Sequence, residues 1–461
     1  MKSGISLARP GAEALSWRNP GVRAVVYQAV ALAAVAAAGF AIFRNTLRNL
    51  EQRGIASGFG FLENEAGFGI SEVMAIPRLE AGFLLLLAAI FGGLLGAYLL
   101  SKWAAHRGKT IGGDLNLVVI FLLLVFGLPL LVFYLITIRS DTYTEASSFG
   151  FALVTGVFNT VKVSALGCVV ATVIGFALGI ARLSSNWLVS RLAAVYIEVI
   201  RNIPLLLQIF FWYFAVIRSL PSVRQSTNLF DFVILNNRGV YLPEPVPEAG
   251  FQPFLWAIGI AFLAIFFWAR QARILRDTTG EQRRVLLPSL AVLVVLPALS
   301  WAAVGPPVSL SFPELQVFNY EGGITLSPEY AAMLVALSMY HAAFIAEIVR
   351  SGIQSVSRGQ REAALALGLR SGHVLRLVII PQALRVMIPP LTSTFLNLTK
   401  NSSLGVAVAY PELHGIGGTI LNQGGQAIEI VALTMAVYLA FSLLISVFMN
   451  WYNARVKLVE R

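Results

Sequence analysis

The sequence of this 461-residue chain is poor in charged residues and contains a single cysteine. Charged residues make up 12% of the chain, about half of their share in ordinary soluble domains, whereas hydrophobic residues make up 57%. This composition excludes a soluble globular protein. The cysteine, Cys168, lies in an apolar run, so a disulfide framework is excluded and a buried free thiol is expected.

Patterns typical of metal sites and catalytic sites are also missing. The four histidines are far apart and follow no ligand spacing, so no metal site is predicted. The tripeptide "GKT" at 108–110 lacks the earlier glycine of a phosphate-binding loop, because position 103 is Trp103. We therefore expect neither an enzyme nor a cofactor bound by this chain.

Long apolar runs recur along the chain, and each is close to the roughly 20 residues that a helix needs to cross a membrane. Because a membrane span must satisfy its backbone hydrogen bonds internally, the sequence predicts an all-α integral membrane protein. The first run follows no cleavage site, so it is expected to remain as a span. About ten transmembrane helices are predicted, near residues 22–43, 81–100, 115–137, 150–180, 193–217, 251–269, 286–304, 329–349, 384–405 and 428–451.

The distribution of basic residues predicts the side that each connection faces. Most Lys and Arg residues face the cytoplasm if both termini are cytoplasmic, although the four arginines in the outer segment 44–80 run against this rule. The predicted parts are a cytoplasmic N-terminus (1–21), a first span with its outer loop (22–80), an extra transmembrane hairpin (81–137) and a main membrane domain (150–455). The main domain contains an inserted hairpin (251–304) and a cytoplasmic loop (350–383).

Two internal similarities are visible in the sequence. Residues 99–133 resemble residues 266–300, which indicates either a helical hairpin used twice or two short turns of shared composition. The segments "AAVYIEVIR" and "AAFIAEIVR" each place a glutamate three residues before an arginine, at the inner end of a predicted span. Side chains at this spacing share a helix face, so two ion pairs are predicted, Glu198 with Arg201 and Glu347 with Arg350.

The segment "SRGQREAALALGLRSGHVLRLVIIPQA" (357–383) is a polar interruption in this apolar chain. Its residues 358–368 predict a short helix of about 16 Å, in which Arg358 and Glu362 can pair one turn apart. Gly368 is expected to end this helix, and Pro381 is expected to stop the following segment. The small side chains allow another backbone to approach closely. The segment is therefore either a docking surface on the cytoplasmic face or a solvated connection.

The spacing of Glu362, Ala363, Ala364, Gly368 and Pro381 resembles the "EAA" loop of permease subunits from ABC importers. The segments 196–214, 344–369 and 397–413 are similar to the polar amino acid permeases, and most of all to the general L-amino acid type. The resemblance covers about residues 40–75 and 138–461. It departs at 77–137, and this departure changes the eight spans usual for the subtype to the ten predicted here.

This resemblance implies a division of labour among several subunits. Spans four, five, eight, nine and ten would form a five-helix permease core in the bacterial inner membrane. Separate ATPase subunits would use ATP and Mg, and would couple through the loop at 357–383. A second related permease subunit and a periplasmic amino-acid-binding protein are also implied, with 44–80 and 218–250 as candidate contacts for the latter. Apart from these proteins, only membrane lipid is an expected partner, and nucleic acid is not.

The path of an amino acid through the membrane requires partners for a carboxylate and an ammonium group, and polar residues at membrane depth are rare. Lys400 can either line such a path or extend to the membrane interface. The candidates on the ninth span are Asn397, Lys400, Asn401, Ser402 and Ser403, with Lys162 and Glu429 outside it.

Two other classes of protein fit the sequence less well. A secondary transporter commonly has broken helices in matched halves, but the paired prolines at 389–390 have no matched partner. A membrane-embedded enzyme needs clustered histidines or acidic residues at membrane depth, and such clusters are missing from the sequence.

Overall fold

The computed structural model describes residues 20–52, 58–73, 76–77, 140–281 and 285–456. In these residues, seven helices are long and apolar enough to cross a membrane, or eight if one bent pair counts as a span. Seven of the eight predicted spans in the described part coincide with these helices, and the eighth, 193–217, falls on the bent pair. The predicted spans at 81–100 and 115–137, and with them the extra hairpin, lie outside the described residues.

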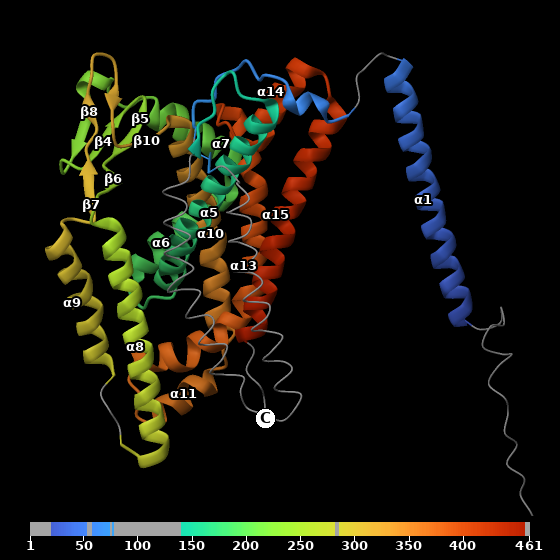
Figure 1. Ribbon diagram of the computed structural model, residues 1–461. Helices are drawn as coiled ribbons and strands as arrows, with labels where there is room; N and C mark the ends of the chain where they lie inside the picture. Colours follow the sequence, from blue (N-terminus) through green and yellow to red (C-terminus); the bar gives the residue numbers. More distant parts are fainter. Residues whose placement is uncertain (1–19, 53–57, 74–75, 78–139, 282–284, 457–461) are drawn as a thin grey trace, which may run out of the picture.

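The centre of the molecule is a bundle of helices that pack side by side (Figure 1). We name its two ends the α14 end and the α11 end, after the short helices α14 (Leu413–Gly424) and α11 (Arg358–Ala366) beside them. The bundle consists of α5 (Phe149–Arg182), α6 (Trp187–Asn202), α7 (Leu205–Phe210), α10 (Pro328–Gln354), α13 (Ile380–Asn401) and α15 (Ala427–Val456).

The contact between α5 and α10 is the most extensive in the bundle, and small residues make it possible. A Cβ atom added to Gly175 would lie 2.6 Å from the Cβ atom of Ile345, and one added to Gly179 would lie 2.7 Å from the carbonyl oxygen of Ala346. Glycines four residues apart are typical of helices that approach closely in membranes. This close contact fixes the C-terminal part of α5 against α10.

The predicted span at 193–217 is not one continuous helix. Helix α6 and the segment Leu205–Ile217 are bent by 106° relative to each other. The bend lies at Ile203 and Pro204, because the residue before a proline favours an extended backbone and Ile203 has φ −95° and ψ 126°. The Gln208 side chain donates hydrogen bonds to the carbonyl oxygens of Ile200 and Ile203, each at 2.9 Å, and so satisfies groups that the break exposes.

The prediction of an all-α protein is wrong for the connections at the α14 end. These connections lie outside the bundle, where one face of a strand can contact water. Short segments in which apolar and polar residues alternate can therefore pair as antiparallel strands. One sheet has four antiparallel strands in the order β10-β5-β4-β3, and three further strand pairs are β1 (Ile76–Pro77) with β2 (Ser140–Asp141), β6 with β7 and β8 with β9. The strands are β3 (Thr227–Leu229), β4 (Val233–Asn236), β5 (Gly239–Leu242), β6 (Glu244–Pro247), β7 (Val308–Ser311), β8 (Glu314–Leu315), β9 (Tyr320–Glu321) and β10 (Ile324–Leu326).

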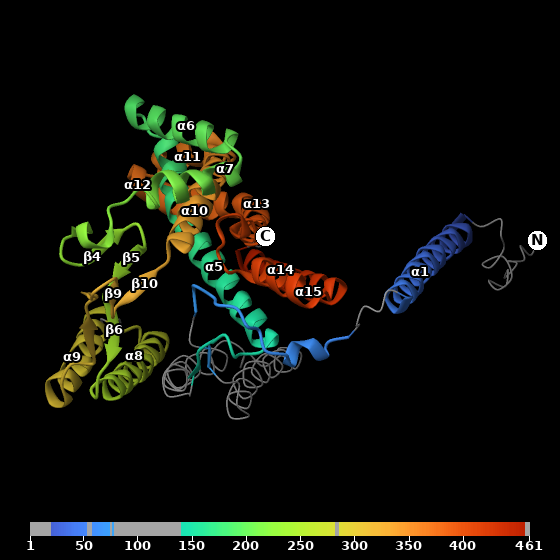
Figure 2. The ribbon, with the colours of Figure 1, turned by 90° about the horizontal axis from the view of Figure 1, so that it is seen from above.

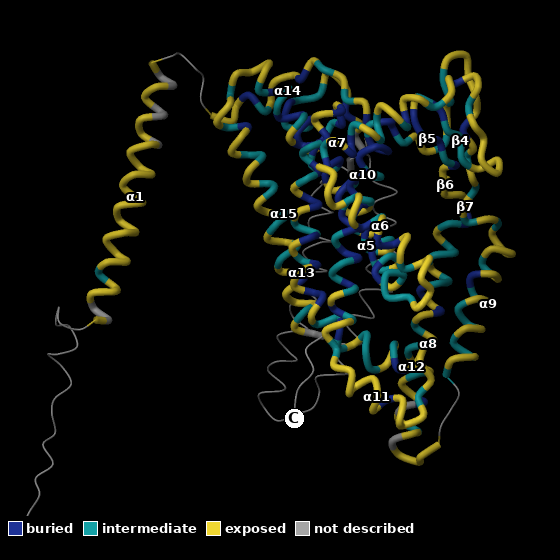
Figure 3. Tube along the Cα trace, turned by 180° about the vertical axis from the view of Figure 1, so that it is seen from behind, coloured by how far each residue is buried: buried dark blue, intermediate teal, exposed yellow. Residues whose placement is uncertain are grey.

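Two parts of the chain lie to the sides of the bundle. Helices α8 (Phe251–Thr279) and α9 (Leu286–Val304), which cover the residues predicted as an inserted hairpin, pack against each other below the strands in Figure 1 and lie side by side in Figure 2. Helix α1 (Pro20–Gln52) stands apart from the bundle and is exposed along its length (Figure 3). Cys168, predicted to be buried, is only half-buried on α5.

Candidate functional site

The segment 357–383 forms the predicted short helix at the α11 end. Helix α11 (Arg358–Ala366) is followed by Gly368, which has φ +79°. The amide of Leu369 donates to the carbonyl oxygen of Ala364 at 3.2 Å, as expected for a helix that ends through a left-handed glycine. The predictions of the helix and of its end at Gly368 are confirmed.

One side of α11 packs against the rest of the chain, and its other side is exposed. Ala364 is 4% exposed, whereas Glu362 and Ala363 are exposed. Leu367, just beyond the helix, is 83% exposed. The predicted ion pair between Arg358 and Glu362 does not form among the described residues. The exposed face therefore offers a carboxylate, a methyl group and a leucine that are free to contact another molecule.

Pro381 does not stop the helix in which it lies. Helix α12 (Ser371–Val374) continues through a π-helical turn (Leu375–Ile379) into α13, and Pro381 is the second residue of α13. A proline is tolerated in the first turn of an α-helix, where its missing N–H leaves no bond unmade. The π-helical turn ends directly before α13, so Pro381 lies in the first turn of α13 although the helical segment is continuous.

The candidates on the ninth predicted span do not form one cluster. Asn397 and Lys400 are exposed. The hydroxyl of the buried Ser402 donates to the carbonyl oxygen of Thr399 at 2.7 Å, and that of Ser403 donates to the carbonyl oxygen of Lys400 at 2.8 Å. These two hydroxyl groups therefore form hydrogen bonds with backbone carbonyl groups at the end of their own helix.

Asn401 is the candidate on this span that reaches another helix. Its Nδ2 atom lies 3.4 Å from Nε2 of His341, a buried residue of α10. Glu429 accepts a hydrogen bond of 2.8 Å from the backbone N–H of Gly58, which attaches the segment 58–73 to the start of α15. The role of all these residues in a substrate path stays a prediction.

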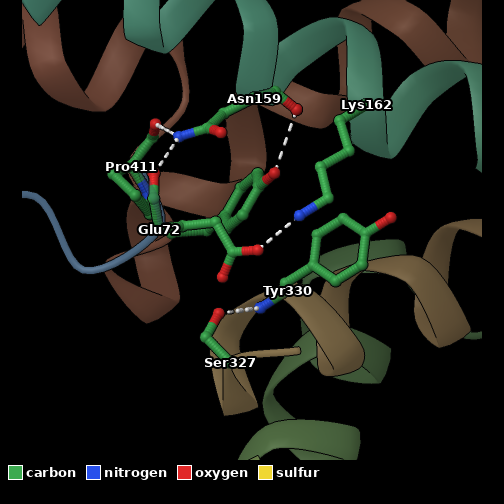
Figure 4. Close-up of polar contacts among 7 residues, drawn as sticks. Glu72, Asn159, Lys162, Ser327, Tyr330 and Pro411 are labelled. Carbon is green, nitrogen blue, oxygen red and sulfur yellow. Dashed lines mark hydrogen bonds and ion pairs between the residues drawn. The ribbon is translucent and has the colours of Figure 1, made fainter. Parts of the chain in front are cut away.

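Lys162 belongs to a polar cluster at the α14 end of the bundle (Figure 4). Its Nζ atom lies 2.5 Å from Oε1 of Glu72, and 4.4 Å from the centre of the Tyr330 ring. The side chain of Lys162 is 27% exposed and that of Glu72 only 7%. An ammonium group in this position is stabilised by its carboxylate partner and by the face of the ring.

Asn159 fixes the backbone around this ion pair. Its Nδ2 atom donates to the carbonyl oxygens of Glu72 at 3.0 Å and of Pro411 at 2.9 Å. The Tyr410 hydroxyl donates to the backbone carbonyl oxygen of Asn159 at 2.9 Å, so α5, the segment of Glu72 and the segment 410–411 meet at Asn159. The roles of Glu72 and Asn159 were not predicted from the sequence. No sequence signal could have found them, because Glu72 lies 90 residues from Lys162.

Glu412 is a second buried carboxylate at the α14 end, and it caps α14 (Leu413–Gly424). It accepts hydrogen bonds from the backbone N–H groups of His414 and Gly415, both at 2.7 Å, and from the Tyr438 hydroxyl at 3.0 Å. Burial raises the pKa of the Glu412 carboxyl, and these donors oppose that rise. Glu412 thus ties α14 to α15.

The two ion pairs predicted near the α11 end differ in outcome. Glu347 and Arg350 pair on α10, as predicted. Arg201 instead lies 5.2 Å from the centre of the Phe344 ring, and it makes no ion pair with Glu198 in the described residues. The prediction of the second pair was wrong because spacing along one helix does not account for an aromatic ring on a neighbouring one.

The bundle of apolar helices, with a short exposed helix at one end, defines an integral membrane protein. A family model described as "Binding-protein-dependent transport system inner membrane component" matches residues 279–458. The chain is 43% identical over 449 residues to the putative amino-acid ABC transporter permease protein YhdX of Escherichia coli, with 97% of each chain covered. It is 40% identical over 443 residues to the general L-amino acid transport system permease protein AapQ of Rhizobium johnstonii, with 96% of this chain and 94% of that one covered.

The chain therefore belongs to the family of amino-acid ABC transporter permeases. It is a transport subunit and not an enzyme. Among solved structures, one described as an amino acid ABC transporter with histidines aligns with a TM-score of 0.40 and 19% identity, over 67% of this chain and 95% of that chain.

Proposed function

We propose that this chain is the permease subunit of an ATP-driven, binding-protein-dependent importer of amino acids in the bacterial inner membrane. The observation that carries the proposal is the identity of 43% over almost the whole chain to an amino-acid ABC transporter permease. The relative AapQ is named for general L-amino acid transport, which supports a broad substrate range.

In this proposal the α11 end faces the cytoplasm and the α14 end faces the periplasm. The exposed face of α11, with Glu362, Ala363 and Leu367, would receive an ATPase subunit that uses ATP and Mg. The direction of α15 supports this orientation, since it runs from the α14 end to the α11 end (Figure 1). Helix α1 begins at the level of the α11 end, which agrees with two cytoplasmic termini.

The remaining partners are assigned by the same orientation. The segment 58–73 and the strands of 218–250 lie at the α14 end, where a periplasmic amino-acid-binding protein would dock. A second related permease subunit would complete the membrane part, and lipid would cover the exposed apolar side chains of α1. For the substrate path we retain Asn401, which contacts His341, and Lys400. Replacement of Lys400 by alanine should reduce uptake of amino acids, and the ATPase subunit should remain bound.

The test is reconstitution with the ATPase subunit and the binding protein in proteoliposomes. We expect co-purification of the ATPase, and uptake of radiolabelled amino acids that requires both ATP and the binding protein. Uptake that persists without ATP and stops when a proton or sodium gradient is collapsed would contradict the proposal and support a secondary transporter.

A further inference from the structure

The ion pair between Lys162 and Glu72 lies where an imported molecule would enter the membrane. Lys162 is twenty residues from Arg182, the last residue of α5, which is about 30 Å at 1.5 Å per residue. This length matches the hydrocarbon thickness of a bilayer. If Arg182 lies at one edge of the hydrocarbon, Lys162 lies at the opposite edge, at the α14 end.

Lys162 needs an anion at this position, and Glu72 supplies it. The Tyr330 ring attracts the ammonium group but carries no charge to neutralise it. The backbone of Glu72 is held by Asn159, but within the described residues the only hydrogen-bond partner of its carboxylate is Lys162. Loss of this single ion pair would leave Lys162 available to another carboxylate.

Asn159 supplies the second group that an amino acid requires. It lies one helical turn before Lys162, so both side chains are on the same face of α5. Asn159 is fully buried, and its Oδ1 atom has no hydrogen-bond partner among the described residues. Because its Nδ2 atom is occupied by two carbonyl oxygens, Oδ1 remains as an acceptor for an ammonium group.

We propose that Lys162 and Asn159 form a binding site for the carboxylate and ammonium groups of an α-amino acid, and that Glu72 occupies its carboxylate position when no substrate is bound. The inference rests on the proposed function, and it adds Asn159 and the internal competitor Glu72 to the earlier candidate Lys162. Recognition of the groups shared by all amino acids accommodates many side chains. Only complexes in which Lys162 is free can bind the substrate carboxylate, so Glu72 lowers the apparent affinity about tenfold if the pair is closed for nine-tenths of the time.

The experiment measures binding of a radiolabelled mixture of L-amino acids to the purified complete complex, without the binding protein. Glu72→Gln should lower the half-saturating concentration about tenfold, because the competing charge is lost. Lys162→Met should abolish saturable binding. The exposed carboxylate of Glu145, in the turn before α5, provides the matched control, and Glu145→Gln should bind as the wild type does.

A variant with both charges exchanged, Glu72→Lys with Lys162→Glu, separates binding from a structural role. It keeps an ion pair, so the complex should assemble, but it places a carboxylate on α5 that repels the substrate carboxylate. We expect loss of binding. Binding equal to that of the wild type, or a half-saturating concentration unchanged by Glu72→Gln, would overturn the inference. Failure of the wild-type complex to transport any amino acid would instead contradict the proposed function.

Discussion

At the scale of single residues, Gly368 shows how one backbone conformation limits substitution. A Cβ atom added there would meet nothing within 4 Å in this chain, but the φ of +79° disfavours any other residue. Gly368→Val should cost about 1–2 kcal/mol locally and add bulk on the side proposed for the ATPase. We expect an expressed and inserted permease with no uptake.

The control for Gly368 is Arg361, an exposed residue of the same short helix. Arg361→Ala should reduce uptake little, because single charges at the rim of an interface usually contribute little. Full uptake by Gly368→Val at normal expression would mean that this loop does not couple ATP hydrolysis to transport.

Glu412 is the residue whose loss should most affect the α14 end. Glu412→Ala removes the cap of α14 and leaves two backbone N–H groups and the Tyr438 hydroxyl without their acceptor. We expect a loss of about 2 kcal/mol of stability, measured by thermal unfolding of the purified complex. Glu321→Ala, which removes an exposed carboxylate in β9, should leave the unfolding temperature unchanged. Equal stability of the two variants would show that the cap is dispensable.

At the scale of secondary-structure elements, the contact of α5 with α10 decides whether the core forms. Gly179→Val should force the two helices apart, because its added atoms would overlap the carbonyl oxygen of Ala346 and the side chain of Val349. We expect less folded protein and a lower unfolding temperature. Ala177→Val makes a similar change on the exposed side of α5 and should be tolerated. Similar unfolding temperatures for both variants would contradict the close packing.

At the scale of the whole molecule, the testable feature is the topology. In a Cys168→Ser background, a cysteine at Thr142, which is exposed just after β2 (Ser140–Asp141), should react with a membrane-impermeant thiol reagent outside intact cells. A cysteine at Lys109, in the turn of the predicted hairpin 81–137, should be protected. Labelling of both positions from outside would rule out the transmembrane hairpin.

The sequence by itself determined the class of protein and the local structure of the proposed coupling segment. Low charge and long apolar runs require membrane helices, since a backbone segment is stable in lipid only when its N–H and C=O groups form hydrogen bonds with one another. The spacing from Glu362 to Gly368 predicted both the short helix and its left-handed end, because capping depends on neighbouring residues. These features depend on composition and on interactions within a few residues.

Only the tertiary structure decided how distant segments meet. The break at Pro204, the strands at the α14 end and the contact of Arg201 with Phe344 all depend on neighbours from other elements. The pairing of Glu72 with Lys162 is the clearest case. No local sequence pattern links a glutamate in a connection to a lysine in a helix. Their ion pair forms because the fold brings the two opposite charges within a few ångströms of each other, where water is scarce.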